Sequence, residues 1–368
     1  MKQTILTFVC LLTAMITFAQ TSKTKEILYI GTYTQKGEGI YVYEFDRSDY
    51  SFKELQVITS KTSPSFLEFH PNKKYLYAAN EGNNTVSSYA IDQATAKLTA
   101  LNAQPSLGKG PCHVAVDPKG RFLYVSNYGS GQLGVYLLNP DGTIGAVADT
   151  IQDKGNPSQK PHMHSVIPSA DGKFIYASDL GIDKIMVYSV DQKTGQLTPG
   201  AVPYAEVKAG DGPRHFAIHP NGNFGYSACE LASVVNSFSI VKGSGALVPL
   251  ERVTMLPGDF TGKSYAADIH FSPDGKFLYA SNRGHESLAI YGVNAKTGKL
   301  TVAGHAETHG KHPRNFLVDQ KGEFVIATNR DNDTVVFFKR NSSTGQLTYT
   351  GKEISIPTPV CVKQLFLN

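Results

Sequence analysis

Short apolar runs recur in a fixed order along nearly the whole chain. Each unit opens with an apolar run and continues through a polar turn rich in Gly, Asp or Asn. It then enters an aromatic-Leu-Tyr run that ends in small residues and usually Asn or Asp. The unit returns with a period of about 40 residues, which is typical of solenoids, propellers and arrays. Its copies lie at Ser63–Asn80, Gly110–Asn127, Lys160–Asp179, Gly212–Cys229, Ala266–Asn282 and His312–Asn329.

Each unit and the segment after it contain four strand-like runs. In the first unit these runs lie near Phe66–Phe69, Tyr75–Ala79, Thr85–Ile91 and Lys97–Leu101. They are rich in Val, Ile, Tyr and Phe and are separated by turn residues. Asp-Gly and Asn-Gly pairs, such as the one at Asp274, supply the positive φ that a tight hairpin needs. No helical period is convincing after the N-terminus. Four antiparallel strands without helices predict a propeller blade.

The two ends of the chain supply one further blade. Thr358–Leu365 resembles a first strand with nothing after it, and Glu26–Thr34 resembles a second strand with nothing before it. Ile40–Phe45 and Phe52–Ile58 provide the third and fourth strands. The prediction is therefore an all-β fold, a seven-bladed β-propeller with four antiparallel strands per blade. Pairing of the N- and C-terminal strands closes the ring and removes exposed sheet edges.

The N-terminus has a different character from the repeats. Lys2 precedes an apolar run from Ile5 to Ala19, which ends in small residues. This pattern predicts a secretory signal peptide over residues 1–19 and a single propeller domain over residues 20–368. We expect a periplasmic or secreted protein that has no membrane association after the signal is removed.

Composition narrows the set of partners. The formal net charge is +4 and the basic residues are spread out, so nucleic acid is not an expected partner. We expect a monomer that acts on a small molecule. Cys112, Cys229 and Cys361 fall in different blades, so we expect buried thiols and no disulfide.

Polar groups converge at one mouth of the predicted channel. In a propeller blade, the start of the first strand and the end of the second lie at the same mouth. These positions carry His162, His164, Arg214, His215, Asp268, His270, Arg314 and Asn315, and then Asn80, Glu81, Asn127, Tyr128, Asp179, Glu230, Asn282, Arg283, Asn329 and Arg330. The N-terminal half-blade adds Thr32, Tyr33 and Thr34. Convergent polar groups in a concavity are the default hypothesis for a site.

Some of these residues have a purely structural interpretation. Asn residues at strand ends commonly bond to turn backbone, and His70 and His219 look like turn residues. Arg214 and Arg314 each follow a proline, and His162 follows Pro161 in what looks like the same register. Three basic groups aimed at one axis would repel each other unless a carboxylate or an anion lay between them. Glu230 is one candidate for that partner and an anionic ligand is another.

Three familiar chemistries are not supported. Gly258–Ser264 imitates a phosphate loop but is one residue short and leads into a strand rather than a helix. No Gly-x-Ser-x-Gly motif is present, so a serine nucleophile has no anchor. His162 and His164 form a possible metal pair, but no third ligand is evident. We therefore expect neither a metal nor a cofactor.

Four segments of the sequence carry a resemblance to a known protein family. The segments GPRHFAIHPNG, PHMHSV, DPKGRFLYVSNYGSGQLGVY and FSPDGKFLYASNRGHESLAIY resemble the seven-bladed propeller lactonases over essentially all of Lys25–Asn368. That family includes propeller-type 6-phosphogluconolactonase and carboxy-muconate lactonizing enzyme. The resemblance implies a catalytic set of His164 (or its neighbour His162), Arg214, Glu230 and Arg283. Substrate contacts are expected from His162, His215, Asp268, Asn282, Arg314 and Arg330.

The expected activity is hydrolysis of a sugar lactone, most like 6-phosphogluconolactonase, by a metal-independent acid–base mechanism. Glu230 or His164 would take a proton from water, and the choice between them stays open. Arg214 and Arg283 would hold the developing oxyanion. 6-Phosphogluconolactone is a cytoplasmic intermediate, whereas the expected signal peptide implies export. A different sugar lactone is therefore an alternative substrate. Two further functions remain open: a muconate-type lyase or cycloisomerase, and a non-catalytic propeller that binds a glycan or protein.

Overall fold

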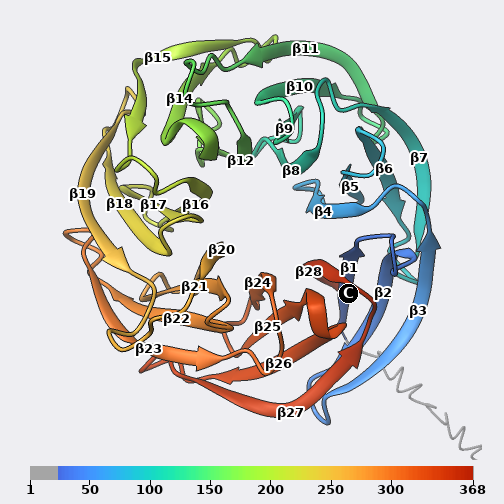
Figure 1. The fold of residues 1–368 in the computed structure, drawn as a ribbon. Helices are drawn as coiled ribbons and strands as arrows, with labels where there is room; N and C mark the ends of the chain where they lie inside the picture. Colours follow the sequence, from blue (N-terminus) through green and yellow to red (C-terminus); the bar gives the residue numbers. More distant parts are fainter. Residues whose placement is uncertain (1–23, 368) are drawn as a thin grey trace, which may run out of the picture.

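The structure is a computed structural model that describes residues 24–367. Seven four-stranded antiparallel sheets stand in a ring around a central axis, as predicted (Figure 1). The helical elements of residues 24–367 are two short 3-10 turns, η1 (Leu180–Ile182) and η2 (Arg330–Asn332). The predicted signal peptide, residues 1–19, lies outside the described residues. No helix within the described part of the chain has the length and apolar character that crossing a membrane requires.

Each blade runs outward from an inner strand at the axis. Blade 1 contains β4 (Pro64–Phe69), β5 (Tyr75–Asn80), β6 (Thr85–Ile91) and β7 (Leu98–Pro105). Blade 2 contains β8 (Pro111–Val116), β9 (Phe122–Asn127), β10 (Gln132–Leu138) and β11 (Ile144–Gln152). Blade 3 contains β12 (Met163–Pro168), β13 (Phe174–Asp179), β14 (Lys184–Val190) and β15 (Leu197–Glu206).

The second half of the ring repeats this plan. Blade 4 contains β16 (Pro213–Ile218), β17 (Phe224–Cys229), β18 (Val234–Ile240) and β19 (Leu247–Thr254). Blade 5 contains β20 (Tyr265–Phe271), β21 (Phe277–Arg283), β22 (Ser287–Val293) and β23 (Leu300–Glu307). Blade 6 contains β24 (Pro313–Val318), β25 (Phe324–Asn329), β26 (Thr334–Arg340) and β27 (Leu347–Ser355).

The two ends of the chain form the closing blade. It contains β28 (Pro359–Leu367), β1 (Lys25–Thr32), β2 (Gly39–Asp46) and β3 (Ser51–Thr59), in that order from the axis. β28 pairs antiparallel with β1 from Lys25 opposite Leu367 to Gly31 opposite Cys361, so the red and blue ends meet in Figure 1. The predicted closure by the terminal strands is confirmed.

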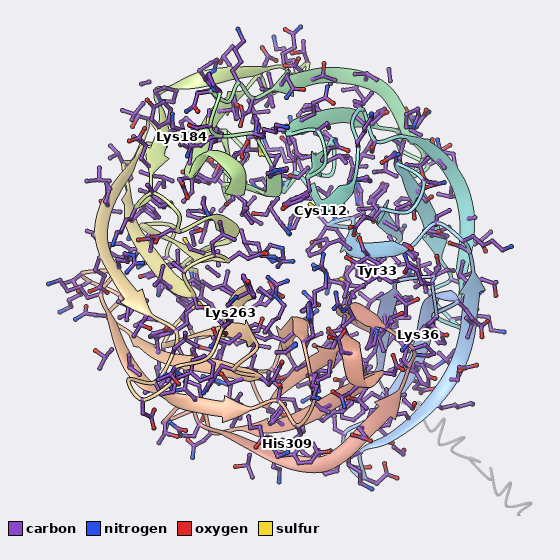
Figure 2. All side chains as sticks on the ribbon, in the orientation of Figure 1. Tyr33, Lys36, Cys112, Lys184, Lys263 and His309 are labelled. Atoms are coloured by element: carbon purple, nitrogen blue, oxygen red, sulfur yellow. The ribbon has the colours of Figure 1, made fainter. Side chains whose placement is uncertain are left out.

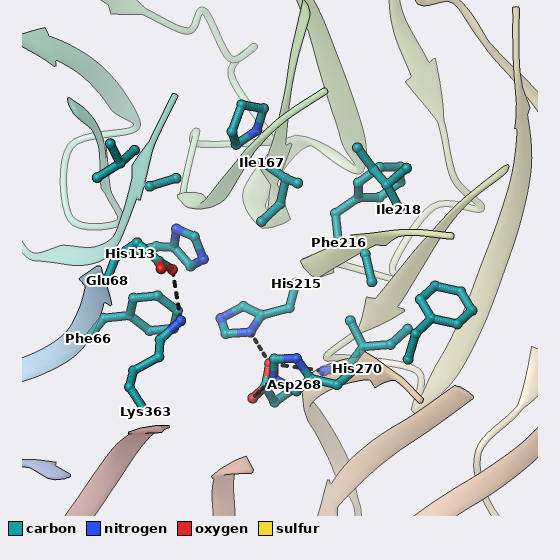
Figure 3. A pocket seen from close by; sticks show the side chains of 16 residues that line it. Phe66, Glu68, His113, Ile167, His215, Phe216, Ile218, Asp268, His270 and Lys363 are labelled. Carbon is teal, nitrogen blue, oxygen red and sulfur yellow. Dashed lines mark hydrogen bonds and ion pairs between the residues drawn. The ribbon is translucent and has the colours of Figure 1, made fainter. Parts of the chain in front are cut away.

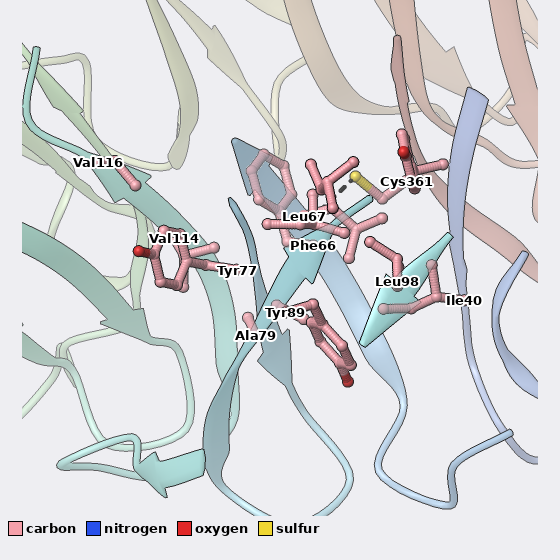
Figure 4. Packing of buried hydrophobic residues seen from close by; sticks show 14 of the residues in the cluster. Ile40, Phe66, Leu67, Tyr77, Ala79, Tyr89, Leu98, Val114, Val116 and Cys361 are labelled. Carbon is pink, nitrogen blue, oxygen red and sulfur yellow. Dashed lines mark hydrogen bonds between the residues drawn. The ribbon is translucent and has the colours of Figure 1, made fainter. Parts of the chain in front are cut away.

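Apolar side chains fill the spaces between neighbouring blades. Figure 4 shows one such layer, in which Ile40, Phe66, Tyr77 and Val114 from the closing blade and blades 1 and 2 share one buried cluster with Cys361. The three described cysteines, Cys112, Cys229 and Cys361, are free and buried, as expected.

In several blades the tyrosine of the aromatic-Leu-Tyr repeat bonds to the next blade, although the hydroxyls of Tyr124 and Tyr176 have no partner among the described residues. The hydroxyl of Tyr226 donates to the carbonyl of Gly298 at 2.8 Å, and Tyr279 donates to Gly345 at 2.8 Å. Each acceptor lies in the hairpin between the third and fourth strands of the following blade. We call such a hydroxyl-to-carbonyl bond between neighbouring blades an inter-blade latch. The bond requires the tyrosine at a fixed position in the second strand.

The tight turns behave as their sequences predict. Gly172 and Gly275 adopt φ of 69°, a conformation that a side chain disfavours. His219 accepts from the Asn221 amide at 3.1 Å and lies 3.1 Å from the Gly275 carbonyl of the next blade. His70 makes the equivalent contact with Gly120 at 3.0 Å. Both histidines are therefore turn residues, as expected.

Candidate active site

Strand pairing sets the height of each side chain along the channel. Pro213 pairs with Cys229 and Pro313 with Asn329 at the starts of two inner strands. In blade 3 the residue at that height is Met163, which pairs with Asp179. His164, not His162, therefore shares the register of Arg214 and Arg314.

The register expected for His162 was wrong, and the reason is local. Pro161 precedes the inner strand of blade 3 by two residues, whereas Pro213 and Pro313 are the first residues of their strands. His162 consequently lies outside β12, at the rim of the mouth. Of the two neighbours that the sequence left open, His164 is the one that shares the register of the arginines.

One carboxylate joins two guanidinium groups at this mouth. Glu230 Oε2 lies 2.9 Å from Arg214 Nε and 2.9 Å from Arg283 Nη2. The arginines are anchored on blade 5 as well, because Arg214 donates to the Ala267 carbonyl and Arg283 donates to the Ala266 carbonyl at 2.8 Å. The structure thus brings together three of the four expected catalytic residues, and Glu230 is the partner that the repulsion argument required.

A third arginine lies in the same region with partners of its own. The Arg314 guanidinium lies 5.3 Å from the centre of the Tyr33 ring, and the Tyr33 hydroxyl donates to Glu81 Oε2 at 3.0 Å. Burial raises the pKa of Tyr33 to about 12, so its hydroxyl stays protonated. Figure 2 places Tyr33 and Cys112 toward the inner side of the ring.

Tyr33 and Glu81 were among the polar groups expected at this mouth, but not in the expected catalytic or substrate-binding sets. Each lies directly after the second strand of its blade, β1 or β5. Their contact joins two blades, so sequence position alone does not reveal it. We refer to Arg214, Arg283, Arg314, Glu230 and His164 together as the arginine mouth.

His164 is the buried imidazole of the arginine mouth. Only 5% of the residue is exposed, and its Nδ1 has no hydrogen-bond partner among the described residues. Burial, and next the charge of Arg214, hold its pKa well below the ordinary value, so the ring is neutral. Its ring meets Tyr128 edge-on at 5.6 Å, while His162 stacks on the same tyrosine at 4.5 Å.

The arginine mouth carries excess positive charge. Burial alone would raise the pKa of Glu230, but Arg214 and Arg283 bring it below the ordinary value, so the carboxylate is ionised at neutral pH. Burial, together with Arg283 and Arg314, lowers the pKa of Arg214 to about 9. Three guanidiniums thus face two carboxylates, Glu230 and Glu81, an arrangement that an anionic ligand would stabilise.

Two of the expected substrate-binding residues lie deeper in the channel. His215 and Asp268 are each one step below the height of the arginines, and His215 Nδ1 lies 2.7 Å from Asp268 Oδ1. Both line a pocket at the opposite end of the channel, and the lining of that pocket includes none of the arginine-mouth residues. The centre of the His215 ring still lies 5.2 Å from the centre of the His164 ring, so His215 lies between the arginine mouth and the pocket at the opposite end.

The remaining two expected contacts have other partners. Asn282 is fully buried and donates to the carbonyl of Met255 at 2.8 Å. Asn127 and Asn329 make the equivalent bonds to Ser106 and Thr308, so this asparagine holds the connection from the preceding blade. That is the structural interpretation of the strand-end asparagines, and it accounts for Asn282. Arg330 lies in η2 at the rim, where its Nε is 2.6 Å from Asp331 Oδ1.

No cluster of three or more His, Cys, Asp or Glu side chains within residues 24–367 is arranged to hold a metal ion. The His162 ring is stacked on Tyr128, whereas the His164 ring meets it edge-on.

The fold agrees with comparisons to known proteins. Residues 27–364 match the family described as "Lactonase, 7-bladed beta-propeller". The chain is 35% identical over 350 residues to the 6-phosphogluconolactonase of Bacillus subtilis (strain 168), an alignment that covers 93% of this chain and 99% of the relative. It is 34% identical over 307 residues to the 6-phosphogluconolactonase of Formosa agariphila, covering 79% of this chain and 86% of that protein.

A solved structure gives the same picture. The periplasmic gluconolactonase PpgL of Pseudomonas aeruginosa superposes with a TM-score of 0.87 at 31% identity, covering 94% of this chain and 99% of that one. The chain belongs to the seven-bladed β-propeller lactonase family.

Proposed function

We propose that this protein hydrolyses a sugar lactone bearing an anionic group, with 6-phospho-D-glucono-1,5-lactone as the first substrate to test. The observation that carries the proposal is the pair of guanidiniums held on Glu230 beside the buried, neutral imidazole of His164. The relatives named 6-phosphogluconolactonase support it, and they do not favour the muconate-type alternative.

His164 is the proposed general base. A neutral imidazole accepts the proton of water as the water oxygen bonds to the lactone carbonyl carbon. Glu230 is poorly suited to that task because its low pKa makes it a weak base and both arginines already contact it. The carboxylate instead holds Arg214 and Arg283 in position.

The arginines stabilise the charge that develops. Negative charge forms on the former carbonyl oxygen of the tetrahedral intermediate, and a preorganised guanidinium stabilises it there. When the ring C–O bond breaks, the protonated His164 returns its proton to the leaving ring oxygen. One water is consumed, and the products are a hydroxyl group and a carboxylic acid, which ionises to the carboxylate and releases a proton to solvent.

Export is the second part of the proposal. The predicted signal peptide over residues 1–19 directs the mature chain to the periplasm or outside the cell. The similarity to a periplasmic gluconolactonase supports that location. An exported enzyme would meet sugar lactones outside the phosphogluconate pathway, so D-glucono-1,5-lactone is the comparison substrate.

A substrate panel tests the activity. Purified mature protein is assayed with the phosphorylated lactone, the unphosphorylated lactone and a muconate. We expect lactone opening, and we expect Glu230→Gln to lower kcat/KM by about a hundredfold or more because the two arginines lose their shared anchor. Arg283→Ala should cost more with the phosphorylated lactone than with the neutral one.

The matched control is Arg121→Ala. Arg121 is paired with Asp117 in a turn at the opposite end of blade 2, so its loss should leave both lactone rates unchanged. Undiminished turnover in both Glu230→Gln and Arg283→Ala would refute the proposal. Turnover of the muconate alone would assign the lyase chemistry instead.

A further inference from the structure

The channel has a second concavity, at the end opposite the arginine mouth. This pocket of about 410 Å³ is formed by the last residues of the inner strands, so it opens toward the turns between the first and second strands (Figure 3). We call it the histidine pocket, after three lining residues: His113, His215 and His270. Its volume is that of an ordinary small-molecule site.

One carboxylate orients two of these histidines. Asp268 places Oδ1 2.7 Å from His215 Nδ1 and Oδ2 2.8 Å from His270 Nε2. Burial would raise the pKa of Asp268, but His270 and His215 hold it well below the ordinary value, so it is a carboxylate. Each imidazole must therefore donate to Asp268 through the nitrogen that faces it.

In the neutral form of either ring, the nitrogen that does not face Asp268 is a hydrogen-bond acceptor. Burial, and next the charge of Arg214, lower the pKa of His215 to about 4, so that ring is neutral at physiological pH. Figure 3 shows it reaching into the pocket from Asp268 toward the side of His113 and Phe66. His113 is also buried, and its Nδ1 has no partner among the described residues.

The charges of the histidine pocket differ from those of the arginine mouth. Lys363 Nζ lies 2.8 Å from Glu68 Oε2, so the ammonium among the lining residues is already paired. Asp268 then leaves the lining with a negative excess, and an anion would be repelled. The opposite wall is apolar and includes Ile167, Ile218 and Phe216.

We propose that the histidine pocket is a separate binding site for a neutral polyhydroxylated molecule of pyranose size, such as an unphosphorylated sugar. Hydroxyl groups supply the donors that His215, His270 and Glu68 lack, and they accept from Lys363. The apolar wall and the Phe66 ring pack against the C–H face of the sugar ring. One channel thus presents a cationic mouth for anionic lactones and an acceptor-rich pocket for neutral sugars.

Calorimetric titration with two probes tests this site. 1,5-Anhydro-D-glucitol is a neutral pyranose without a reactive anomeric carbon, and D-gluconate is an anionic, open-chain polyhydroxy acid. We expect saturable binding of anhydroglucitol with a Kd of about 1 mM or below, and gluconate binding at least about tenfold weaker at this pocket. Ile167→Trp fills the pocket and should weaken anhydroglucitol binding by about tenfold or more.

Two further variants make the result decisive. His270→Leu removes one acceptor at the rim, where the side chain is 36% exposed, and should also weaken binding while the fold stays intact. Arg283→Ala, at the other end of the channel, should leave anhydroglucitol affinity unchanged. Sugar binding is measured without turnover, so its outcome is separate from that of the lactonase proposal.

Several outcomes would overturn the site. The first is that anhydroglucitol shows no saturable binding. The second is that Arg283→Ala abolishes its binding while Ile167→Trp leaves it intact. The third is that gluconate binds as tightly as the neutral sugar and that Ile167→Trp weakens this gluconate binding. Titration with zinc chloride adds one more, because a stoichiometric zinc ion that excludes anhydroglucitol would assign the pocket to a metal.

Discussion

At the scale of single residues, the protonation state of His164 determines what the arginine mouth can do. The imidazole is buried beside Arg214, and the pKa shift that results keeps it neutral well into the acid range. Glu230 is ionised over the same range because of its two arginines. A neutral base beside a fixed cationic pair is the combination that ester hydrolysis by water needs.

The pH dependence of kcat/KM should report this depressed pKa. A base works when deprotonated, so activity falls only as pH drops below its pKa. Because the pKa of His164 lies well below 6.5, we expect the rate to stay level through pH 6.5 and to decline at more acid pH. His164→Asn should lower kcat by about a hundredfold with little change in KM.

Arg214→Leu is the diagnostic variant for this pH profile. It removes the largest electrostatic contribution to the His164 shift, so the acid limb should move toward higher pH even though the rate falls. His309→Asn is the control, because His309 stacks on Tyr349 of the outermost strand of blade 6. An acid limb already at pH 6.5, or one that Arg214→Leu leaves in place, would contradict the assignment of His164.

At the scale of elements, the chain leading into blade 3 contains a buried carboxyl pair. Asp153 follows β11 and Asp179 ends β13, and both are almost fully buried. Asp179 Oδ1 accepts from the backbone of His162 at 2.7 Å, so the pair lies directly beneath the rim of the mouth. Burial, and next the charge of Asp179, raise the pKa of Asp153 to about 7.

Stability should therefore fall as pH rises through this pKa. The folded state favours the protonated form of Asp153, so its contribution is complete below about pH 4 and is lost by about pH 8. Asp153→Asn imitates the protonated form and should raise Tm at pH 8 far more than at pH 4. The gain is on the order of 4 kcal/mol, because the pKa is raised from 3.8 to about 7 and each pKa unit is worth about 1.4 kcal/mol. Asp141→Asn, in an exposed turn, should show no such difference, and equal shifts at both pH values would disprove the pair.

The inter-blade tyrosines give a second test at this scale. Tyr226 and Tyr176 occupy the same place in their blades and both are fully buried. Tyr226 donates to Gly298, whereas the Tyr176 hydroxyl has no partner among the described residues. Tyr226→Phe should cost about 1 kcal/mol in the free energy of unfolding, and Tyr176→Phe should be neutral or stabilising. Equal losses in denaturant titrations would show that the latch contributes nothing.

At the scale of the whole molecule, stability depends on closing the ring. β28 is the inner strand of the closing blade, and it buries Val360, Cys361, Val362, Leu365 and Leu367. It lies far from β1 in the sequence, so closure joins two segments that are separated by nearly all of the described chain. A ring without β28 would leave β1 unpaired along its inner edge.

Deleting residues 359–368 should consequently destroy the cooperative fold. We expect aggregation or a broad, low-temperature melt by circular dichroism, because an unpaired edge and an open core face are exposed together. Removal of Asn368 alone is the control and should leave Tm unchanged. A soluble truncated protein with an unaltered melt would show that ring closure is dispensable.

Much of this architecture was predictable from the sequence because its causes are local. Alternating apolar residues, Asn-Gly turns and the repeated tyrosine determine strands and hairpins over a few residues each. Repetition then determines the blade count, and the unmatched first and last strands predict closure. The rule that strand-one starts and strand-two ends share a mouth placed Arg214, Glu230, Arg283 and His164 there.

Only the tertiary structure decided how those residues meet. A shift of two residues between Pro161 and the start of β12 puts His164, and not His162, in the register of Arg214, and sequence spacing does not reveal it. The bridge from Glu230 to two arginines and the Tyr33–Glu81 contact join strands of different blades. Asp268 faces His215 and His270 rather than the mouth for the same reason. Strand patterns depend on neighbours in the chain, whereas these contacts depend on distances across the ring, which no local pattern encodes.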